Sequence, residues 1–186
     1  MFQIRIHGRG GQGVVTAAEL MSVAAFMEGQ HAQAFPSFGS ERMGAPVVAF
    51  CRIHDREIRS REPVMQPDAV IIQDPTLLHS VDVFDGLAPD GYVLVNTSQS
   101  LDQLGIDDLL NTQPAGHVRT VAATDLALAH VGRPIPNAAL LGGFAAMTGV
   151  IELEAVKAAI KQKFPGTVGD KNVSAASAAY DAVRAQ

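Results

Sequence analysis

The fold is decided by residues 1–14, MFQIRIHGRGGQGV. From residue 2 to residue 7, apolar and polar residues alternate, which is the period-two signature of a β-strand. The glycine-rich residues 8–13 form a turn. Apolar residues then recur at helical spacing until Gly29, where the helix is expected to end: Val14, Ala18, Met21 and Ala25. The N-terminal segment is therefore predicted to fold as a strand, a glycine turn and a helix.

Strands and helical segments keep alternating beyond this unit, which predicts a Rossmann-like α/β fold. We expect further strands at residues 31–35, 47–53, 69–73, 91–95 and 118–122. Asp74-Pro75 is typical of a helix start, with Asp74 as the N-cap and proline at the first helical position, and Thr124 is expected to open another helix. Strands that are joined through helices form right-handed crossovers and a mostly parallel sheet flanked by helices.

The last third of the chain, from Asn137 onward, contains no predicted strand. One amphipathic helix presents an apolar face at helical spacing, made by Leu153, Val156, Ile160 and Phe164. A final helix is expected at residues 173–183. No linker, internal repeat or low-complexity tract divides the chain, so residues 1–186 are predicted to form a single domain with a helical C-terminal third.

Composition excludes several classes of protein. The 186 residues are 47% hydrophobic and 18% charged, which is typical of a globular protein, and the net charge of −5 disfavours nucleic-acid binding, which needs a basic face. The single cysteine, Cys51, lies in an apolar run, so an intramolecular disulfide and a cysteine-ligated iron–sulfur or zinc site are excluded. The longest nearly apolar stretch, residues 138–151, is too short to span a bilayer. We expect a soluble cytoplasmic protein with no membrane or nucleic-acid partner.

The turn from Gly8 to Gly13 matches the G-x-G-x-x-G pattern that binds phosphate groups when it joins a strand to a helix. Glycines let the backbone approach a ligand, and the helix N-terminus offers unpaired N–H groups and a partial positive charge. NAD binding is disfavoured, because the second strand ends at Ala34-Phe35-Pro36 without the carboxylate that would bind the ribose, and Glu28 falls within the helical pattern. The alternative interpretation is that the glycines only allow close packing of the helix on the strand.

The proline-bounded loop at residues 36–46 is the second informative segment. In a doubly wound sheet the strand before it would lie next to the first strand, which places the loop at the same carboxyl edge as the glycine turn. Ser40 and Arg42 would then offer a hydroxyl and a guanidinium to a phosphate, whereas Phe38 and Met43 would contact a flat ring or a neighbouring subunit. Alternatively, the loop serves only as a subunit interface.

Two asparagines are also expected at this edge. Asn96 follows a strand, and Asn137 follows Pro136 at the start of a helical run. Either amide could reach a ligand, although an N-cap role alone also explains Asn137.

Sequence motifs for catalysis are missing. The six histidines lack metal-ligand spacing, and the chain contains neither a G-x-S-x-G elbow nor a phosphate loop of the form G-x-x-x-x-G-K-S/T. We therefore assign no catalytic and no metal-binding residue, and we expect that the chain does not run redox or hydrolytic chemistry alone.

Together, these segments resemble the γ subunit of 2-oxoacid:ferredoxin oxidoreductases, and the pyruvate/ketoisovalerate type in particular. The resemblance extends over nearly the whole chain. It is carried by Gly8-Arg9-Gly10-Gly11-Gln12-Gly13-Val14, Pro36-Ser37-Phe38-Gly39-Ser40-Glu41-Arg42-Met43-Gly44-Ala45-Pro46, Pro67-Asp68, Asn96-Thr97, Pro136-Asn137, Leu140-Leu141-Gly142 and Lys171-Asn172-Val173.

This resemblance implies a subunit of an enzyme that oxidatively decarboxylates a 2-oxoacid and joins the acyl group to coenzyme A (CoA). The partners would be α, β and ferredoxin-like δ subunits, which would carry thiamine diphosphate, Mg²⁺ and iron–sulfur clusters, whereas this chain alone would bind no cofactor. Electrons would pass through the partners to ferredoxin, or to NAD through a flavoprotein subunit. CoA, a co-substrate with a pyrophosphate and a 3′-phosphate, is expected to be held by Gly11, Gln12, Gly13, Ser40, Arg42 and Asn137.

Two other functions remain open from the sequence. One is a stand-alone Rossmann-type protein that binds a nucleotide or NAD, against which the missing ribose carboxylate counts. The other is a scaffold subunit whose glycine turn binds nothing. The sequence does not identify the 2-oxoacid, the electron acceptor or the subunit stoichiometry.

Overall fold

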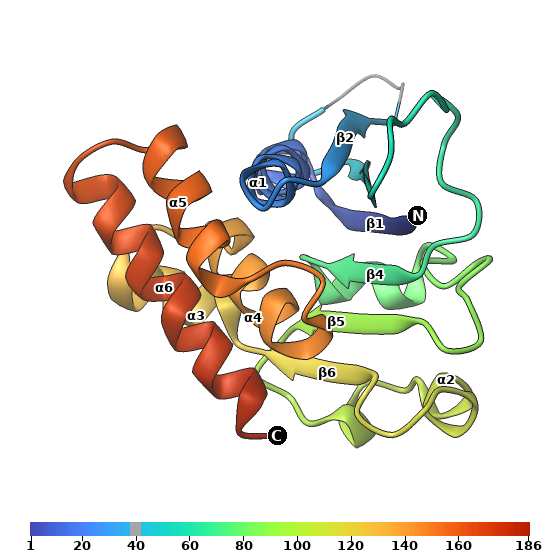
Figure 1. Cartoon of the computed structure of the whole chain (residues 1–186). Helices are drawn as coiled ribbons and strands as arrows, with labels where there is room; N and C mark the ends of the chain where they lie inside the picture. Colours follow the sequence, from blue (N-terminus) through green and yellow to red (C-terminus); the bar gives the residue numbers. More distant parts are fainter. Residues whose placement is uncertain (38–41) are drawn as a thin grey trace.

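A computed structural model describes residues 1–37 and 42–186 of the chain (Figure 1). Over these residues, six strands form one sheet in the order β2-β3-β1-β4-β5-β6. Parallel pairing joins β1 to β4, β4 to β5 and β5 to β6, which confirms the predicted Rossmann-like, mostly parallel α/β fold. The strands are β1 (Phe2–Arg9), β2 (His31–Pro36), β3 (Pro46–His54), β4 (Ala69–Ile72), β5 (Tyr92–Asn96) and β6 (Val118–Val121).

The strand order departs from the prediction at β3, which lies between β1 and β2 and runs antiparallel to both. The prediction that the strand at residues 31–35 is the neighbour of the first strand is therefore wrong. A parallel neighbour needs a crossover of a dozen or more residues, usually with a helix. The connection between Pro36 and Pro46 is too short for one, so the chain returns antiparallel and β3 pairs with β1. Because β2 still runs in the direction of β1, both strands end at the same edge of the sheet.

The helices gather mainly on one side of the sheet, where α1 and the C-terminal helices lie together (Figure 1). The helical C-terminal third is confirmed. The last helix, α6, begins at Thr167 rather than at residue 173, because polar residues and a glycine in its first turns hide the helical period in the sequence. The helices, with two 3₁₀ turns, are α1 (Val14–Met27), η1 (Pro75–His79), η2 (Leu101–Gln103), α2 (Asp107–Thr112), α3 (Ala123–His130), α4 (Asn137–Thr148), α5 (Leu153–Lys163) and α6 (Thr167–Arg184).

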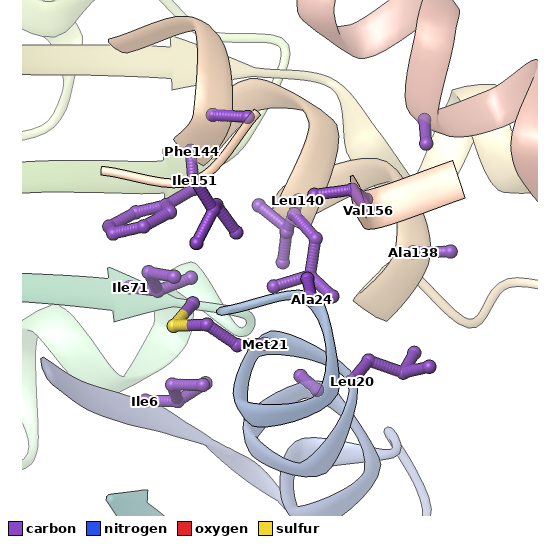
Figure 2. Close-up of a cluster of buried hydrophobic side chains, with 14 of the residues drawn as sticks. Ile6, Leu20, Met21, Ala24, Ile71, Ala138, Leu140, Phe144, Ile151 and Val156 are labelled. Atoms are coloured by element: carbon purple, nitrogen blue, oxygen red, sulfur yellow. The ribbon is translucent and has the colours of Figure 1, made fainter. Parts of the chain in front are cut away.

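The larger hydrophobic core lies between these helices and the sheet. Figure 2 shows Ile6 of β1 and Ile71 of β4 facing Met21 of α1 and Phe144 of α4. Cys51 of β3 belongs to the same core, and burial raises the pKa of its thiol to about 12. Cys51 is thus the small buried hydrophobe that the apolar run predicts.

The opposite face of β4, β5 and β6 carries a second, smaller core. Val70, Ile72, Val93, Val95 and Val118 are covered there by apolar residues of the 3₁₀ turns and connecting loops, including Leu77, Val83, Leu104 and Ile106. The two cores pack against both faces of the sheet and hold its strands in place, so the loops at the carboxyl ends of the strands extend from a rigid sheet.

Helices α4 and α6 pack with their backbones in close approach. A Cβ built on Gly142 of α4 would overlap the carbonyl oxygen of Ala176 on α6, so only glycine fits at this contact. In the described part of the chain, no helix combines the length and the apolar character needed to cross a membrane.

Candidate functional site

The glycine turn between β1 and α1 has a conformation that only glycine adopts easily. Gly13 is the N-cap of α1 with φ 73° and ψ 34°, in the left-handed region, and its carbonyl accepts the N–H of Ala17 at 3.0 Å. A Cβ at Gly13 would also lie 2.7 Å from Nδ2 of Asn137. Gly13 is therefore required both by the turn and by the approach of α4.

Gln12 lies in the same turn, but its side chain is fully engaged by protein groups. Its Oε1 accepts the N–H of Arg9 at 2.7 Å, and its Nε2 donates to Oδ2 of Asp74 at 2.8 Å. The same carboxylate pairs with Nε of Arg9 at 3.3 Å. Partial burial alone would raise the pKa of Asp74, but hydrogen bonds from Thr76 and Gln12 and the charge of Arg9 lower it overall. Gln12 thus braces the turn, and Arg9 is held rather than freely mobile.

The loop between β2 and β3 meets the glycine turn, as the sequence predicts. The N–H of Gly10 donates to the carbonyl of Ala45 at 2.9 Å, and the N–H of Gly44 donates to the carbonyl of Gly10 at 3.1 Å. Arg42 is exposed, and Met43 is 87% exposed beside Gly11. Ser40 and Phe38 lie outside the described residues.

A cavity of about 490 Å³ opens on the other side of the turn, where three helices begin. Gly13 and Thr16 belong to the start of α1, Asn137 to the start of α4, and Val168 to the start of α6. The full lining is Gly11, Gly13, Thr16, Val131, Arg133, Ile135, Asn137, Lys163, Phe164, Val168, Lys171 and Asn172. Helix N-termini offer free N–H groups to an anionic ligand, while Val131 and Phe164 bring the C-terminal ends of α3 and α5 to the same lining.

A smaller hollow of about 160 Å³ adjoins the cavity against the first turn of α1. Gly11, Gly13 and Thr16 line both spaces. The glycine backbone is consequently accessible from two sides, and a phosphate could approach it without meeting a Cβ.

Two buried polar residues line the cavity, Asn137 and Asn172, and the Nδ2 of Asn172 donates to the carbonyl of Val168 at 2.9 Å. Asn137 is the one with a free donor. It is 4% exposed, and its Oδ1 accepts the N–H of Ala138 at 2.8 Å. Among the described residues, none accepts a hydrogen bond from its Nδ2, which lies over Gly13. The N-cap position itself is occupied by Pro136, so the N-cap prediction for Asn137 is wrong by one residue. This Nδ2 reaches the accessible space of the cavity, where a ligand or water can accept its hydrogen bond.

Asn96, the other asparagine at this edge, has a structural role. Its Nδ2 donates to the carbonyl of Gln73 at 2.8 Å and to Oγ1 of Thr124 at 2.8 Å. Its Oδ1 accepts the N–H of Thr124 at 3.1 Å. Since each polar atom has a partner, Asn96 links β5 to β4 and α3 and leaves no group for a ligand.

The structure therefore brings together Gly11, Gly13 and Asn137 of the predicted site, whereas Gln12 and Arg42 do not line the cavity. It also adds Arg133, Lys163 and Lys171, which the site prediction missed although the family resemblance included Lys171. Arg133 lies between α3 and α4, Lys163 ends α5 and Lys171 belongs to α6, so no local sequence pattern connects the three. The described lining contains no histidine, cysteine or carboxylate, and its charged side chains are all basic.

Comparisons with known proteins identify the family of the chain. Residues 3–182 match the family described as pyruvate ferredoxin/flavodoxin oxidoreductase. The chain is 47% identical to the pyruvate synthase subunit PorC of Methanothermobacter marburgensis, over 99% of this chain and 98% of that protein. It is 49% identical to the common γ subunit of the pyruvate/ketoisovalerate oxidoreductases of Thermococcus kodakarensis, over 97% of this chain and 96% of that protein.

A solved structure extends the agreement to the fold. The crystal structure of the pyruvate oxidoreductase subunit PORC from Thermotoga maritima superposes with a TM-score of 0.81 at 38% identity, covering 97% of this chain and 95% of that one. The resemblance noted in the sequence is thereby confirmed. The chain belongs to the pyruvate ferredoxin/flavodoxin oxidoreductase family, as one of its γ (PorC) subunits.

Proposed function

We propose that this γ subunit helps to bind CoA in a cytoplasmic enzyme that oxidatively decarboxylates a 2-oxoacid to an acyl-CoA. The observation that carries the proposal is the cavity at which α1, α4 and α6 begin and into which the buried amide of Asn137 offers a free donor. Its volume of about 490 Å³ is within the range of small-molecule sites. CoA fits the chemistry because its phosphates are anions that accept hydrogen bonds from N–H groups.

The residues expected from the sequence contribute in different ways to this proposal. Gly11, Gly13 and Asn137 line the cavity and would contact the ligand directly. Gln12 would act through the conformation of the turn, because Arg9 and Asp74 engage its side chain. Arg42 and Ser40 would contact CoA from the loop beside the turn.

The chemical steps are assigned to partner subunits. With one buried cysteine, the chain lacks the thiolates of an iron–sulfur cluster, so the clusters, thiamine diphosphate and Mg²⁺ are proposed to lie in the α, β and δ partners. Electrons would leave through these partners to ferredoxin, or to NAD through a flavoprotein. The name of the relative from Thermococcus kodakarensis, a common subunit of two oxidoreductases, supports the view that the γ subunit does not select the 2-oxoacid.

The alternative of a stand-alone NAD-binding protein fits the geometry less well. In a dinucleotide-binding sheet, the ribose is bound at the end of the strand next to β1 by a carboxylate. Here the antiparallel β3 occupies that position, and β2 ends at Pro36 on the edge of the sheet.

Asn137→Asp in the assembled enzyme tests the proposal. The carboxylate keeps the acceptor for the N–H of Ala138 but replaces a hydrogen-bond donor by a negative charge near the phosphates. We expect the KM for CoA to rise about tenfold or more, with little change in the KM for the 2-oxoacid. Steady-state kinetics of the intact complex measure both constants.

Asn111→Asp is the matched control, because Asn111 is exposed on α2, outside the cavity lining. Native mass and thermal unfolding show whether each variant assembly is intact. An unchanged KM for CoA in an intact Asn137→Asp enzyme would reject CoA binding at this cavity. Arg42→Ala in the same assay decides whether Arg42 belongs to the site.

A further inference from the structure

Three basic side chains line the cavity, in addition to the groups expected from the sequence. Arg133 lies in the connection between α3 and α4, Lys163 at the end of α5, and Lys171 in the second turn of α6. No carboxylate belongs to the described lining. The chain as a whole has a net charge of −5, so this concentration of positive charge is local.

The three cations are not equally available to a ligand. Nζ of Lys163 pairs with Oε2 of Glu19 at 3.2 Å. Within the described part of the chain, neither Arg133 nor Lys171 forms an ion pair. Both are exposed at the cavity. Because helices both begin and end at the lining, the positive charge of the cavity comes from these side chains rather than from the helix dipoles. Two unpaired cations and the Asn137 donor thus surround one space.

We propose that Arg133 and Lys171 bind the phosphate groups of CoA, so that the adenosine half of the molecule occupies this cavity. The inference rests on the proposed function and adds to it the orientation of the ligand. The pyrophosphate and the 3′-phosphate both belong to the adenosine half of CoA, whereas the thiol end is uncharged. The basic cavity therefore takes the adenosine half, and the thiol points out toward the partner subunits that form the acyl group.

Neutral substitutions in the assembled enzyme test the assignment, namely Arg133→Gln, Lys171→Gln and the double variant. Two constants are measured: the KM for CoA, and the inhibition constant of adenosine 3′,5′-bisphosphate as a competitor of CoA. We expect each substitution to raise both constants about three- to tenfold, because an exposed charge-assisted contact is weakened by solvent. The double variant is expected to show a larger rise than either single variant.

Lys161→Gln is the matched control. Lys161 lies on α5 like Lys163, pairs with Asp170 at 3.6 Å and does not line the cavity. We expect it to leave both constants at their wild-type values. Because all of the substituted side chains are exposed, the assemblies should remain intact, and native mass checks this.

The outcomes separate this inference from the proposed function. If Asn137→Asp raises the KM for CoA but the double variant changes neither constant, CoA binds here in another orientation and the inference is wrong. If neither Asn137→Asp nor the double variant changes the KM, the proposed function itself is wrong. Inorganic phosphate that competes as strongly as the bisphosphate would also overturn the inference, because the cavity would then select a lone phosphate.

Discussion

His7 of β1, the residue just before Gly8, is buried without a hydrogen-bond partner for its imidazole. It is 4% exposed, and its Nε2 has no hydrogen-bond partner among the described residues. Strand alternation turns it away from the face that carries Ile4 and Ile6. Burial, reinforced by the charge of Arg5, lowers the pKa of His7 to about 4. The imidazole is consequently neutral at physiological pH and takes no part in the cavity.

This burial makes the stability of the chain depend on pH. Because the folded-state pKa is depressed from 6.5 to about 4, the unfolded chain binds a proton between these values that the folded chain does not. Stability therefore falls as the pH drops through this window, by about 2 kcal/mol from about pH 7 to about pH 5. A His7→Gln variant should lose this part of the slope in urea unfolding at several pH values.

His31→Gln, which removes an exposed histidine, serves as the control and should keep the wild-type slope. Equal slopes for the His7→Gln variant and the wild type would show that the pKa of His7 is the same in the folded and the unfolded chain. In that case another group would have to accept its hydrogen bonds.

At the residue scale, the cavity-lining residues that could be predicted from the sequence are those that depend on local backbone geometry. Gly11 and Gly13 followed from the turn pattern, because its chemistry is contained in a few neighbouring positions. Asn137 followed from the family resemblance and its place at a helix start. Arg133 and Lys163 were not predicted, because their proximity arises only when α3, α4, α5 and α6 pack together.

At the element scale, the closest packing is between α4 and α6. Gly142 of α4 faces the backbone of Ala176 without space for a methyl group, whereas a Cβ on Gly143 would be 3.2 Å from a methyl of Val183. The two glycines are adjacent on one helix and have the same intrinsic helix propensity. Substituting each glycine by alanine therefore distinguishes the effect of the close backbone contact on stability from the effect of helix propensity.

Gly142→Ala is expected to push α4 and α6 apart and to lower the free energy of unfolding by roughly 3 kcal/mol or more. Gly143→Ala should change it by less than about 1 kcal/mol, since alanine gains helix propensity and the Val183 side chain can adjust. Urea unfolding of both variants measures the difference. Equal stabilities would show that the helices tolerate a wider separation.

The elements were predicted well, but their order in the sheet was not. Alternation of apolar and polar residues located β1, and short apolar segments bounded by turn residues located β4, β5 and β6. It could not show that β3 inserts beside β1, since a strand pattern does not encode direction. The length of the connection between Pro36 and Pro46 was the signal that could have revealed the antiparallel return.

At the scale of the whole molecule, the chain is expected to work within an assembly. The tagged chain purified anaerobically from its own host should have a native mass well above 19.6 kDa and should contain thiamine and iron. The chain produced alone should contain neither, because these groups are proposed to bind partner subunits. A bare monomer or homodimer from the native host would instead favour the stand-alone nucleotide-binding protein.

The cavity also has a consequence for how the protein is made. Its lining runs from Gly11 to Asn172, so it joins residues from nearly opposite ends of the chain. During synthesis the glycine turn leaves the ribosome early, but the wall that α6 supplies is the last to emerge. A nascent chain can therefore form its N-terminal strand and helix while the pocket is still open on one side. The cavity is therefore complete only once α6 has emerged, and a message truncated before α6 yields a sheet whose cavity lacks one wall.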